Sequence, residues 1–367
     1  MTDRAKNIIT VCIFTVFLFA IFFWEILAPK KAVSESERRS LADFPVLSSK
    51  TVLSGRFMKN FENYAMDQFP LRDSFRTVKA LSSFYVFCRK DVNSIYRAEG
   101  HLSKLEYPLQ EASVSNAASK LSRLYDEYLA NSNTRVYMSV IPDKNYFLAE
   151  ANRYPSMDYD ALAKLFVSQM DASIKYIDIY NVLELSDYYK TDTHWRQEKI
   201  VDVAAALASE MGVSISTDYQ EHTLEEPFYG VYHGQAALPL PAEPISYLEN
   251  DALNMCTVFD HETNKEIDIY NMELAQGRDP YELFLSGAKG LLTIKNPSAQ
   301  NDRCLILFRD SFGSSIAPLL ATGYSKVVLI DIRYLSSALL SDMVDFRDSD
   351  VLFLYSTLVL NHSEMLK

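Results

Sequence analysis

The sequence predicts an α/β protein in which a parallel β-sheet is flanked by helices. Helical patterns and short apolar runs alternate between residues 111 and 207, and the alternation resumes between residues 304 and 355, which is typical of a parallel sheet. A charge-free stretch, residues 8–23, precedes this region. Because 48% of the 367 residues are hydrophobic, the chain can bury one large core or two modest ones.

The charge-free stretch, continued through Ala28, reaches the roughly 20 residues that a membrane-spanning helix requires. Lys30 and Lys31 follow at once, and no clear small-x-small cleavage site separates them from the apolar residues. We therefore expect residues 1–31 to form an uncleaved transmembrane signal anchor. With its short N-terminal tail in the cytosol, the rest of the chain would lie outside the cytoplasm, at the cell membrane.

Charge and cysteine usage narrow the class of protein. The formal net charge is −12, and because residues 1–31 contribute +2, the remainder carries −14. A region this acidic is a poor non-specific ligand for nucleic acid, so we expect no nucleic-acid partner.

The sequence has four cysteines: Cys12, Cys88, Cys256 and Cys304. Cys12 lies in the apolar stretch, and Cys304 lies in an apolar run that is expected to be a buried strand. The cysteines therefore suggest no disulfide framework.

Residues 32–110 are expected to form a linker followed by a helical segment. Apolar residues repeat at helical spacing from Phe57, and Pro70 should end that helix. A second amphipathic run covers residues 75–87. Both helices are expected to pack against other parts of the protein.

Residues 111–367 are expected to form the α/β domain. Its predicted strands are residues 135–141, 174–180, 304–308, 326–332 and 351–355, and its predicted helices include residues 159–170, a helix after Thr191 and residues 335–344. Residues 217–296 break the rhythm with Pro, Tyr, His and short β-like runs. We interpret this stretch as a β-rich insertion.

Two short motifs offer a nucleophile and a base. Ser311 follows the apolar run 304–308 and precedes a helical pattern, so it should lie at the carboxyl edge of the sheet, where ligands bind and helix amides face an anion. A serine hydroxyl needs a neighbouring base, and Asp192 and His194 offer an imidazole with a carboxylate. Asp and Ser are also common helix caps, and an isolated D-x-H is a weak signal, so it is the joint pattern that favours a catalytic site.

These motifs, Asp192-Thr193-His194-Trp195 and Arg309-Asp310-Ser311-Phe312, resemble the D-x-H-W and G-D-S-F motifs of the alginate O-acetyltransferase branch of the SGNH hydrolase-like proteins. The resemblance is strongest to the bacterial DHHW family and covers most of the chain after the anchor. It implies a three-layer, SGNH/flavodoxin-like parallel sheet. It also implies that Ser311 is the nucleophile, His194 the base and Asp192 its orienting partner.

The sequence departs from that pattern in two places. Arg309 stands where the motif has glycine, which could alter the approach to the oxyanion site. The Gly and Asn blocks that complete the oxyanion hole of ordinary SGNH esterases have no clear counterpart. The donors therefore stay unassigned beyond the amides near Ser311.

Three cations fall just after predicted strands, at the edge expected for Ser311: Lys144, Arg309 and Arg333. They suggest an anionic sugar, phosphate or carboxylate in the substrate, although each could be an ordinary solvated loop charge. Tyr334 is a candidate sugar contact. His194 and Glu198 are four residues apart on a presumed helix face, but the other histidines show no ligand spacing, so we expect no metal. The sequence has no phosphate-binding glycine loop that would point to a cofactor.

The resemblance implies a membrane-anchored, extracytoplasmic O-acyltransferase, in particular an O-acetyltransferase, that modifies hydroxyls of a cell-surface or exported polysaccharide. It also implies a membrane-bound O-acyltransferase as the partner that delivers the acyl group. Three alternatives stay open: a carbohydrate O-acetylesterase, a non-catalytic glycan-binding or scaffold protein of a polysaccharide-modifying complex, and a secreted lipase-like hydrolase.

Overall fold

A computed structural model describes residues 2–130 and 132–367. Contacts divide the chain into two compact units, Met1–Asn93 with His233–Leu240, and Ser94–Tyr232 with Pro241–Lys367. We refer to them as the N-terminal unit and the α/β unit. Helix α9 (Val231–Ala236) is divided between them.

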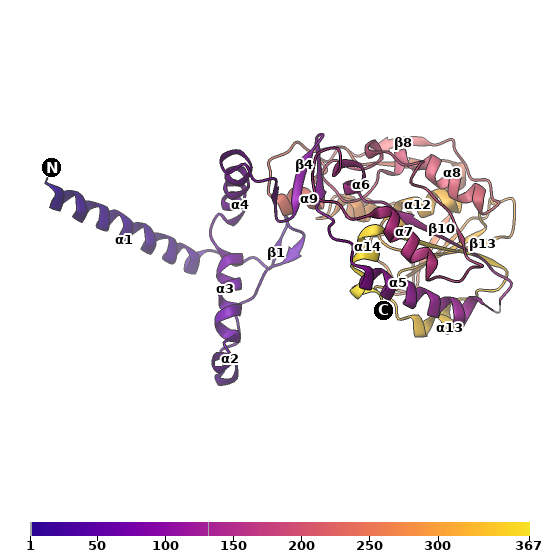
Figure 1. The fold of residues 1–367 in the computed structure, drawn as a ribbon, viewed down its shortest axis with the longest axis horizontal. Helices are drawn as coiled ribbons and strands as arrows, with labels where there is room; N and C mark the ends of the chain where they lie inside the picture. Colours follow the sequence, from indigo (N-terminus) through magenta and orange to yellow (C-terminus); the bar gives the residue numbers. More distant parts are fainter. Residues whose placement is uncertain (1, 131) are drawn as a thin grey trace. The chain divides into compact units, whose positions relative to one another are not determined.

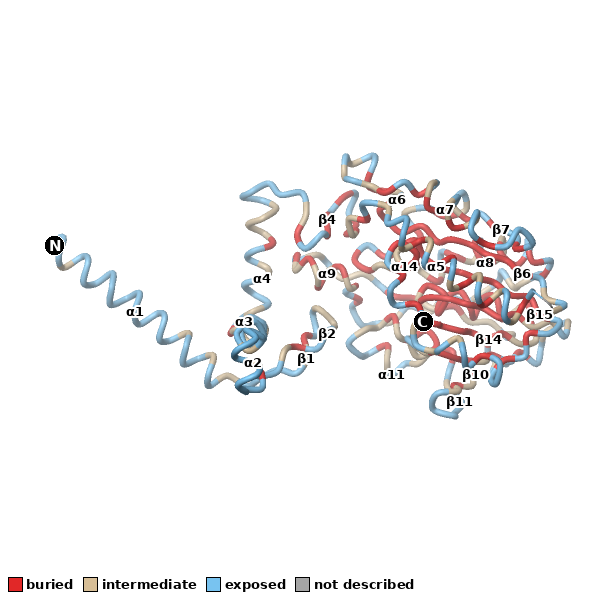
Figure 2. Tube along the Cα trace, turned by 60° about the horizontal axis from the view of Figure 1, so that its bottom comes forward, coloured by how far each residue is buried: buried red, intermediate tan, exposed pale blue. Residues whose placement is uncertain are grey.

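The N-terminal unit begins with a long apolar helix, α1 (Asp3–Leu27), of 25 residues with a mean hydropathy of 2.4. This helix is labelled in Figure 1, and none of its residues is buried (Figure 2). By length and composition α1 can cross a membrane, as a permanent anchor or as a signal sequence.

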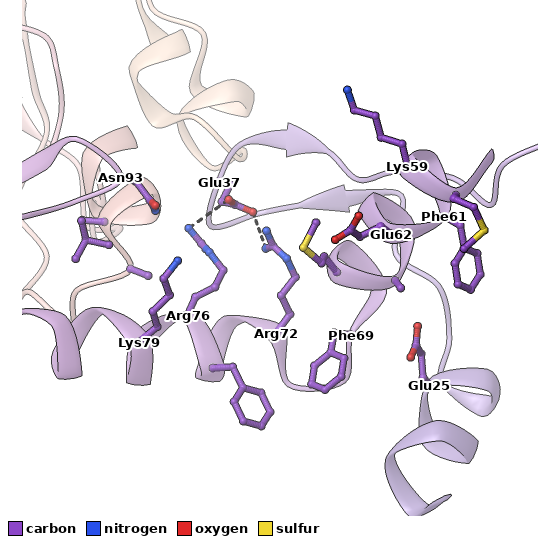
Figure 3. A pocket seen from close by; sticks show the side chains of 17 residues that line it. Glu25, Glu37, Lys59, Phe61, Glu62, Phe69, Arg72, Arg76, Lys79 and Asn93 are labelled. Carbon is purple, nitrogen blue, oxygen red and sulfur yellow. Dashed lines mark ion pairs between the residues drawn. The ribbon is translucent and has the colours of Figure 1, made fainter. Parts of the chain in front are cut away.

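Short elements make up the rest of this unit. They are β1 (Val33–Ser34), β2 (Arg39–Ser40), α2 (Ser49–Leu53), α3 (Arg56–Gln68), α4 (Arg72–Leu81), a π-helical turn η1 (Ser82–Val86) and β3 (Asp91–Val92). The predicted helix from Phe57 thus ends two residues before Pro70, and the second amphipathic run corresponds to α4 and η1. The Glu37 carboxylate holds α4 by ion pairs to Arg72 and Arg76, with N–O distances of 2.5 and 3.2 Å (Figure 3).

The α/β unit is built on an eight-stranded sheet of order β11-β10-β12-β14-β13-β15-β6-β7. Five neighbouring strands are parallel: β14 (Lys326–Ile330), β13 (Cys304–Arg309), β15 (Ser349–Ser356), β6 (Arg135–Ile141) and β7 (Lys175–Tyr176). Three strands continue the sheet in antiparallel pairing: β12 (Leu291–Lys295), β10 (Thr257–Asp260) and β11 (Lys265–Ile267). The sheet is therefore mostly parallel, as predicted, with an antiparallel extension.

Alternate residues of the central strands bury opposite faces of this sheet. Leu305 and Leu307 of β13 belong to the cluster formed with α8 (Val201–Glu210) and α12 (Gly313–Ala321). Ile306 and Phe308 belong to the cluster formed with α5 (Glu111–Leu124), α7 (Tyr159–Ser168) and α14 (Thr357–Asn361). Helices thus cover both faces (Figure 1), and the central strands β13 and β15 are almost continuously buried (Figure 2). This is the predicted three-layer arrangement.

Shorter elements complete the α/β unit. They are β4 (Ile95–Ala98), β5 (His101–Lys104), η2 (Tyr125–Leu129), α6 (Lys144–Leu148), η3 (Leu185–Asp187), η4 (Gln197–Lys199), β8 (Gln220–Thr223), β9 (Ser246–Glu249), α10 (Asp251–Asn254), α11 (Met272–Ala275), η5 (Pro280–Leu283), η6 (Ser337–Leu339), α13 (Leu340–Met343) and η7 (Ser363–Met365). The stretch 217–296, predicted as a β-rich insertion, supplies β10, β11 and β12, which extend the main sheet, and β8 and β9, which pair with each other.

Two local predictions were wrong. The strand predicted over residues 174–180 pairs only at β7, because the Asp178 carboxylate accepts a hydrogen bond from Tyr180 N at 2.9 Å and turns the chain. His194 does not lie on a helix: it precedes η4 in an irregular segment whose one bridge joins Tyr188 to Trp195. His194 and Glu198 therefore do not share a helix face.

Candidate active site

Ser311 lies in the turn that joins the carboxyl end of β13 to α12, and it is partly exposed. The turn is held by Asp310, whose Oδ1 accepts a hydrogen bond from Phe312 N at 3.0 Å and whose Oδ2 accepts one from Ser356 N at 2.8 Å. The second bond ties the turn to the end of β15. The Ser311 hydroxyl is thus presented from a turn that is fixed on both sides.

His194 contacts both Ser311 and Asp192. Its Nε2 lies 2.8 Å from Ser311 Oγ, and its Nδ1 lies 2.6 Å from Asp192 Oδ1. Because a carboxylate only accepts, Nδ1–H donates to Asp192 and leaves Nε2 free to accept the Ser311 hydroxyl proton. This order of contacts is what a base-activated hydroxyl requires.

Asp192 is fully buried and is held by the segment before α9. Its Oδ2 accepts a hydrogen bond from Val231 N at 2.8 Å, and Gly230 N donates to Thr191 Oγ1 at 2.9 Å. A Cβ at Gly230 would lie 2.3 Å from Asp192 N, so only glycine allows this close packing. Glu243 accepts hydrogen bonds from Thr191 N and Thr191 Oγ1, at 2.7 and 2.6 Å, and fixes the chain just before Asp192.

Tyr281, from η5, packs directly on the imidazole. The two rings are stacked, with centroids 3.9 Å apart and planes 6° apart. The Tyr281 hydroxyl lies 2.8 Å from Ser315 Oγ on α12, and the same Oγ accepts a hydrogen bond from Trp195 Nε1 at 2.9 Å. The ring of His194 is therefore held between its carboxylate partner and a stack that is itself tied to α12.

The chain shares its fold with a DHHW family protein. That protein, from Eubacterium siraeum, matches with a TM-score of 0.60 and 21% identity over 74% of this chain and 93% of its own. Bacillus cereus PatB1, solved alone and with a sulfonyl adduct, matches with a TM-score of 0.54 and 21% identity over 72% of this chain and 95% of its own in the adduct structure. No family sequence profile and no curated protein sequence matches the chain. The shared fold agrees with the DHHW and SGNH resemblance of the two motifs.

Lys144, predicted as a substrate contact, is buried at the carboxyl end of β6. Its Nζ donates to the carbonyl oxygens of Tyr189 and Lys190, at 2.8 and 3.2 Å. Burial lowers the pKa of the Lys144 ammonium to about 7. These contacts make Lys144 a support for the backbone that leads into Asp192.

Arg309 and Arg333 share one carboxylate, Asp331, at the end of β14. Arg309 is fully buried, with a guanidinium nitrogen 3.6 Å from Asp331 Oδ2 and a hydrogen bond to Lys289 O at 3.3 Å. Arg333 donates to Asp331 Oδ2 at 2.6 Å, and its guanidinium lies 5.5 Å from the ring centre of Tyr334, which is 51% exposed. Of these three predicted contacts, Tyr334 is the most open to solvent.

The amides that follow Ser311 are already occupied. Phe312 N donates to Asp310 Oδ1, Gly313 N donates to Asp310 O at 3.0 Å, and Ser314 N donates to Ser311 O at 3.2 Å. Within residues 2–130 and 132–367, no acceptor for the Ser311 N–H is found. This amide is the free donor nearest to the hydroxyl.

Sequence reasoning missed Gly230, Glu243 and Tyr281, which all support the base or its carboxylate. They lie in the irregular stretch after residue 217, where no motif marks them, and only the Asp279-Pro280 turn signal precedes Tyr281. In the described part of the chain, no group of His, Cys, Asp and Glu side chains is arranged to hold a metal.

Proposed function

We propose that this chain is an SGNH-type serine O-acyltransferase that transfers acetyl groups to hydroxyls of a cell-surface or exported polysaccharide. The observation that supports it most directly is the continuous set of contacts from Ser311 Oγ through His194 to Asp192, at 2.8 and 2.6 Å. The acetyl group and the glycan acceptor come from the resemblance of the two motifs to the DHHW family and the alginate O-acetyltransferase branch.

In the first half-reaction, the Ser311 hydroxyl proton passes to His194 Nε2 while Oγ attacks the acetyl carbonyl carbon. The oxyanion that forms is stabilised by the Ser311 N–H, and the leaving group takes the proton from Nε2 as its bond to carbon breaks. In the second half, a sugar hydroxyl gives its proton to Nε2 and attacks the acetyl-serine, which releases the acetylated sugar and restores Ser311. Asp192 stabilises the imidazolium in both halves.

The assignment of Ser311 as the nucleophile is tested with the full chain in lipid nanodiscs. A nitrophenyl acetyl ester serves as the acyl donor and an oligosaccharide as the acceptor. We expect nitrophenol release, acetylated oligosaccharide, and a sulfonyl fluoride adduct on Ser311; the probe is chosen because PatB1 has been solved with a sulfonyl adduct. Ser311→Ala should lose all three signals. Ser314→Ala is the matched control, since the buried Ser314 Oγ has no hydrogen-bond partner among the described residues. Equal activity of Ser311→Ala and wild type would rule out this nucleophile.

The effect of the oligosaccharide acceptor on the reaction distinguishes acetyl transfer from hydrolysis. Nitrophenol release that is unchanged by the oligosaccharide, with no acetylated sugar detected, would identify a carbohydrate O-acetylesterase. A non-catalytic glycan-binding protein is the second candidate, and the occupied amides of Phe312, Gly313 and Ser314 favour it. Glycan binding without any sulfonyl adduct would select that candidate.

We also propose that α1 anchors the chain with the α/β unit outside the cytoplasm, beside a membrane-bound O-acyltransferase that delivers the acyl group. The proposal is supported by the length and hydropathy of α1. Protease added to sealed, right-side-out cells should digest the α/β unit, and crosslinking should capture a multispanning acyltransferase. Protection from protease in sealed cells would contradict the orientation.

A further inference from the structure

Outside α1, exposed apolar side chains are concentrated in one short region of the chain. Among described residues, positions 44–87 hold 14 exposed large hydrophobic residues, whereas positions 90–367 hold nine. Soluble proteins scatter such residues singly and rarely gather them in one region. The region spans α2, α3, α4 and η1, all within the N-terminal unit.

Four aromatic side chains of this region form an apolar cluster at the surface of α3. Phe44, which is 60% exposed, contacts Phe57, Phe61 and Tyr64 edge to face, with ring centroids 6.5, 6.0 and 5.2 Å apart. An aromatic cluster of this kind is usually buried in a core. Here it remains on the surface of α3.

A cavity of about 1130 Å³ adjoins this surface, and every residue that lines it belongs to the N-terminal unit. Apolar side chains such as Phe61 and Phe69 line it together with the cations Lys59 and Lys79 (Figure 3). Glu25, from the last turn of α1, lines the same cavity. The apolar surface therefore continues from the end of a helix that has the length and hydropathy of a membrane span.

This region differs from residues 91–367 in the sign of its net charge. Residues 44–90 hold eight basic and three acidic residues, a net charge of +5, whereas residues 91–367 hold 22 basic and 40 acidic residues, a net charge of −18. Arg72 and Arg76 are paired with Glu37. Lys59 and Lys79 are exposed, and no carboxylate partner is found for either within the described residues. Free cations beside exposed aromatic rings suit the headgroup layer of an anionic membrane.

We propose that residues 44–90 form a binding surface for a bilayer of anionic phospholipid, with the cavity as its deepest apolar part. The exposed apolar residues are spread over several separate elements. A fluid lipid surface can accept apolar residues from all these elements at once. The basic charge selects anionic headgroups, and the aromatic side chains enter the boundary between headgroups and acyl chains. The surface acts in addition to α1 and does not depend on catalysis by Ser311.

The test uses tryptophan fluorescence of the full chain in nanodiscs that contain brominated acyl chains, which quench only a nearby indole. In a Trp24→Phe background the remaining native indole, Trp195, is fully buried in the α/β unit. Phe75→Trp then places a reporter at an exposed position of α4 that lines the cavity. Tyr334→Trp is the matched control, because it is similarly exposed but lies in the α/β unit.

We expect brominated phosphatidylglycerol to remove most of the Phe75→Trp fluorescence, brominated phosphatidylcholine to remove much less, and neither lipid to affect Tyr334→Trp. Adding Lys59→Glu and Lys79→Glu to Phe75→Trp should reduce the quenching in phosphatidylglycerol. Sulfonyl labelling of Ser311 should be unchanged in that variant and shows that it is folded. Equal fluorescence of Phe75→Trp in brominated and plain phosphatidylglycerol would overturn the proposal, as would equal quenching of the two reporters.

Discussion

The imidazole of His194 lies flat against the phenol ring of Tyr281, with 3.9 Å between the ring centroids and 6° between the planes. The stack prevents the imidazole from rotating away from Ser311, and the contact to Ser315 fixes the phenol in turn. Tyr281 is therefore expected to act as a positioning residue for the base.

Two substitutions of Tyr281 distinguish the role of its ring from the role of its hydroxyl. Tyr281→Phe keeps the stack, so ester turnover should stay within a few-fold of wild type, although loss of the buried hydroxyl contact should lower stability by about 1 kcal/mol. Tyr281→Leu removes the stack and should lower kcat roughly tenfold to a hundredfold, since small displacements of a catalytic group have effects of that order. Steady-state kinetics on the aryl ester checks both variants. Equal losses in the two would show that the hydroxyl, not the ring, is what matters.

Asp192→Asn should abolish most turnover and leave the fold intact, because the amide preserves the shape of the carboxylate but cannot stabilise the imidazolium. If the proposed mechanism holds, kcat should fall about 10³- to 10⁴-fold, the size of effect known for serine triads. Asp350→Asn is the control: Asp350 is also fully buried, paired with Arg135 and Arg303 at the far end of β15. It should lose stability and keep its activity below the unfolding temperature. A fully active Asp192→Asn variant would remove this carboxylate from the mechanism.

Gly230→Ala should disturb the site without touching a catalytic side chain. The added Cβ would meet the backbone of Thr191 and Asp192 at 2.3 Å, so the carboxylate must move away from His194. We expect kcat to fall by about two orders of magnitude. In Gly100→Ala the Cβ meets nothing within 4 Å, but φ is +80°. That control should cost about 1 kcal/mol of stability through backbone strain and leave kcat unchanged.

Lys144 should make stability depend on pH. Burial lowers the pKa of its ammonium to about 7 in the folded protein, from an ordinary value of 10.5. Between pH 7 and 9 the unfolded chain therefore binds more protons, so the free energy of unfolding should rise with pH, by at most about 1.4 kcal/mol per pH unit. In Lys144→Met this rise should disappear, and the unpaired carbonyl groups of Tyr189 and Lys190 should lower overall stability by about 1–3 kcal/mol.

Denaturant unfolding at pH 7, 8 and 9 measures this slope. Lys175→Met is the control, because Lys175 is exposed and pairs with Glu210 on the surface. Its slope should match that of wild type. A Lys144→Met variant with the wild-type slope would show that another group titrates in this range.

The central strands were predictable because they are buried on both faces and read as uninterrupted apolar runs. The prediction for β6 matches the structure residue for residue, and those for β13 and β15 differ by at most two residues at an end. The antiparallel strands β10 and β11 lie at one edge of the sheet, where exposed positions interrupt the apolar pattern. Their membership in the main sheet depends on the pairing of β10 with β12 and of β11 with β10, which no local pattern reveals.

The candidate site was predictable only in part. Asp192, His194 and Ser311 stand in two recognisable motifs, and the structure brings their polar atoms within hydrogen-bonding distance; their catalytic role is our proposal. For Lys144 and Arg309 the predicted edge of the sheet is correct but their burial was not predicted, because burial depends on groups distant in the chain. Gly230 and Tyr281 reach the site through packing and hydrogen bonds that no sequence motif marks.

The position of β15 has a consequence for how this protein is made. It lies between β13 and β6, yet in the sequence it follows every other strand that the structure describes. While the ribosome extends the chain, the backbone edges of β6 and β13 that pair with β15 therefore remain unpaired until about residue 356 has emerged. Such long-range closure is slow and leaves nascent strands open to aggregation, so we expect the chain to need a chaperone while it folds. Since Asp310 also binds the backbone of Ser356, the serine turn is fixed only after Ser356 has been synthesised and β15 has paired.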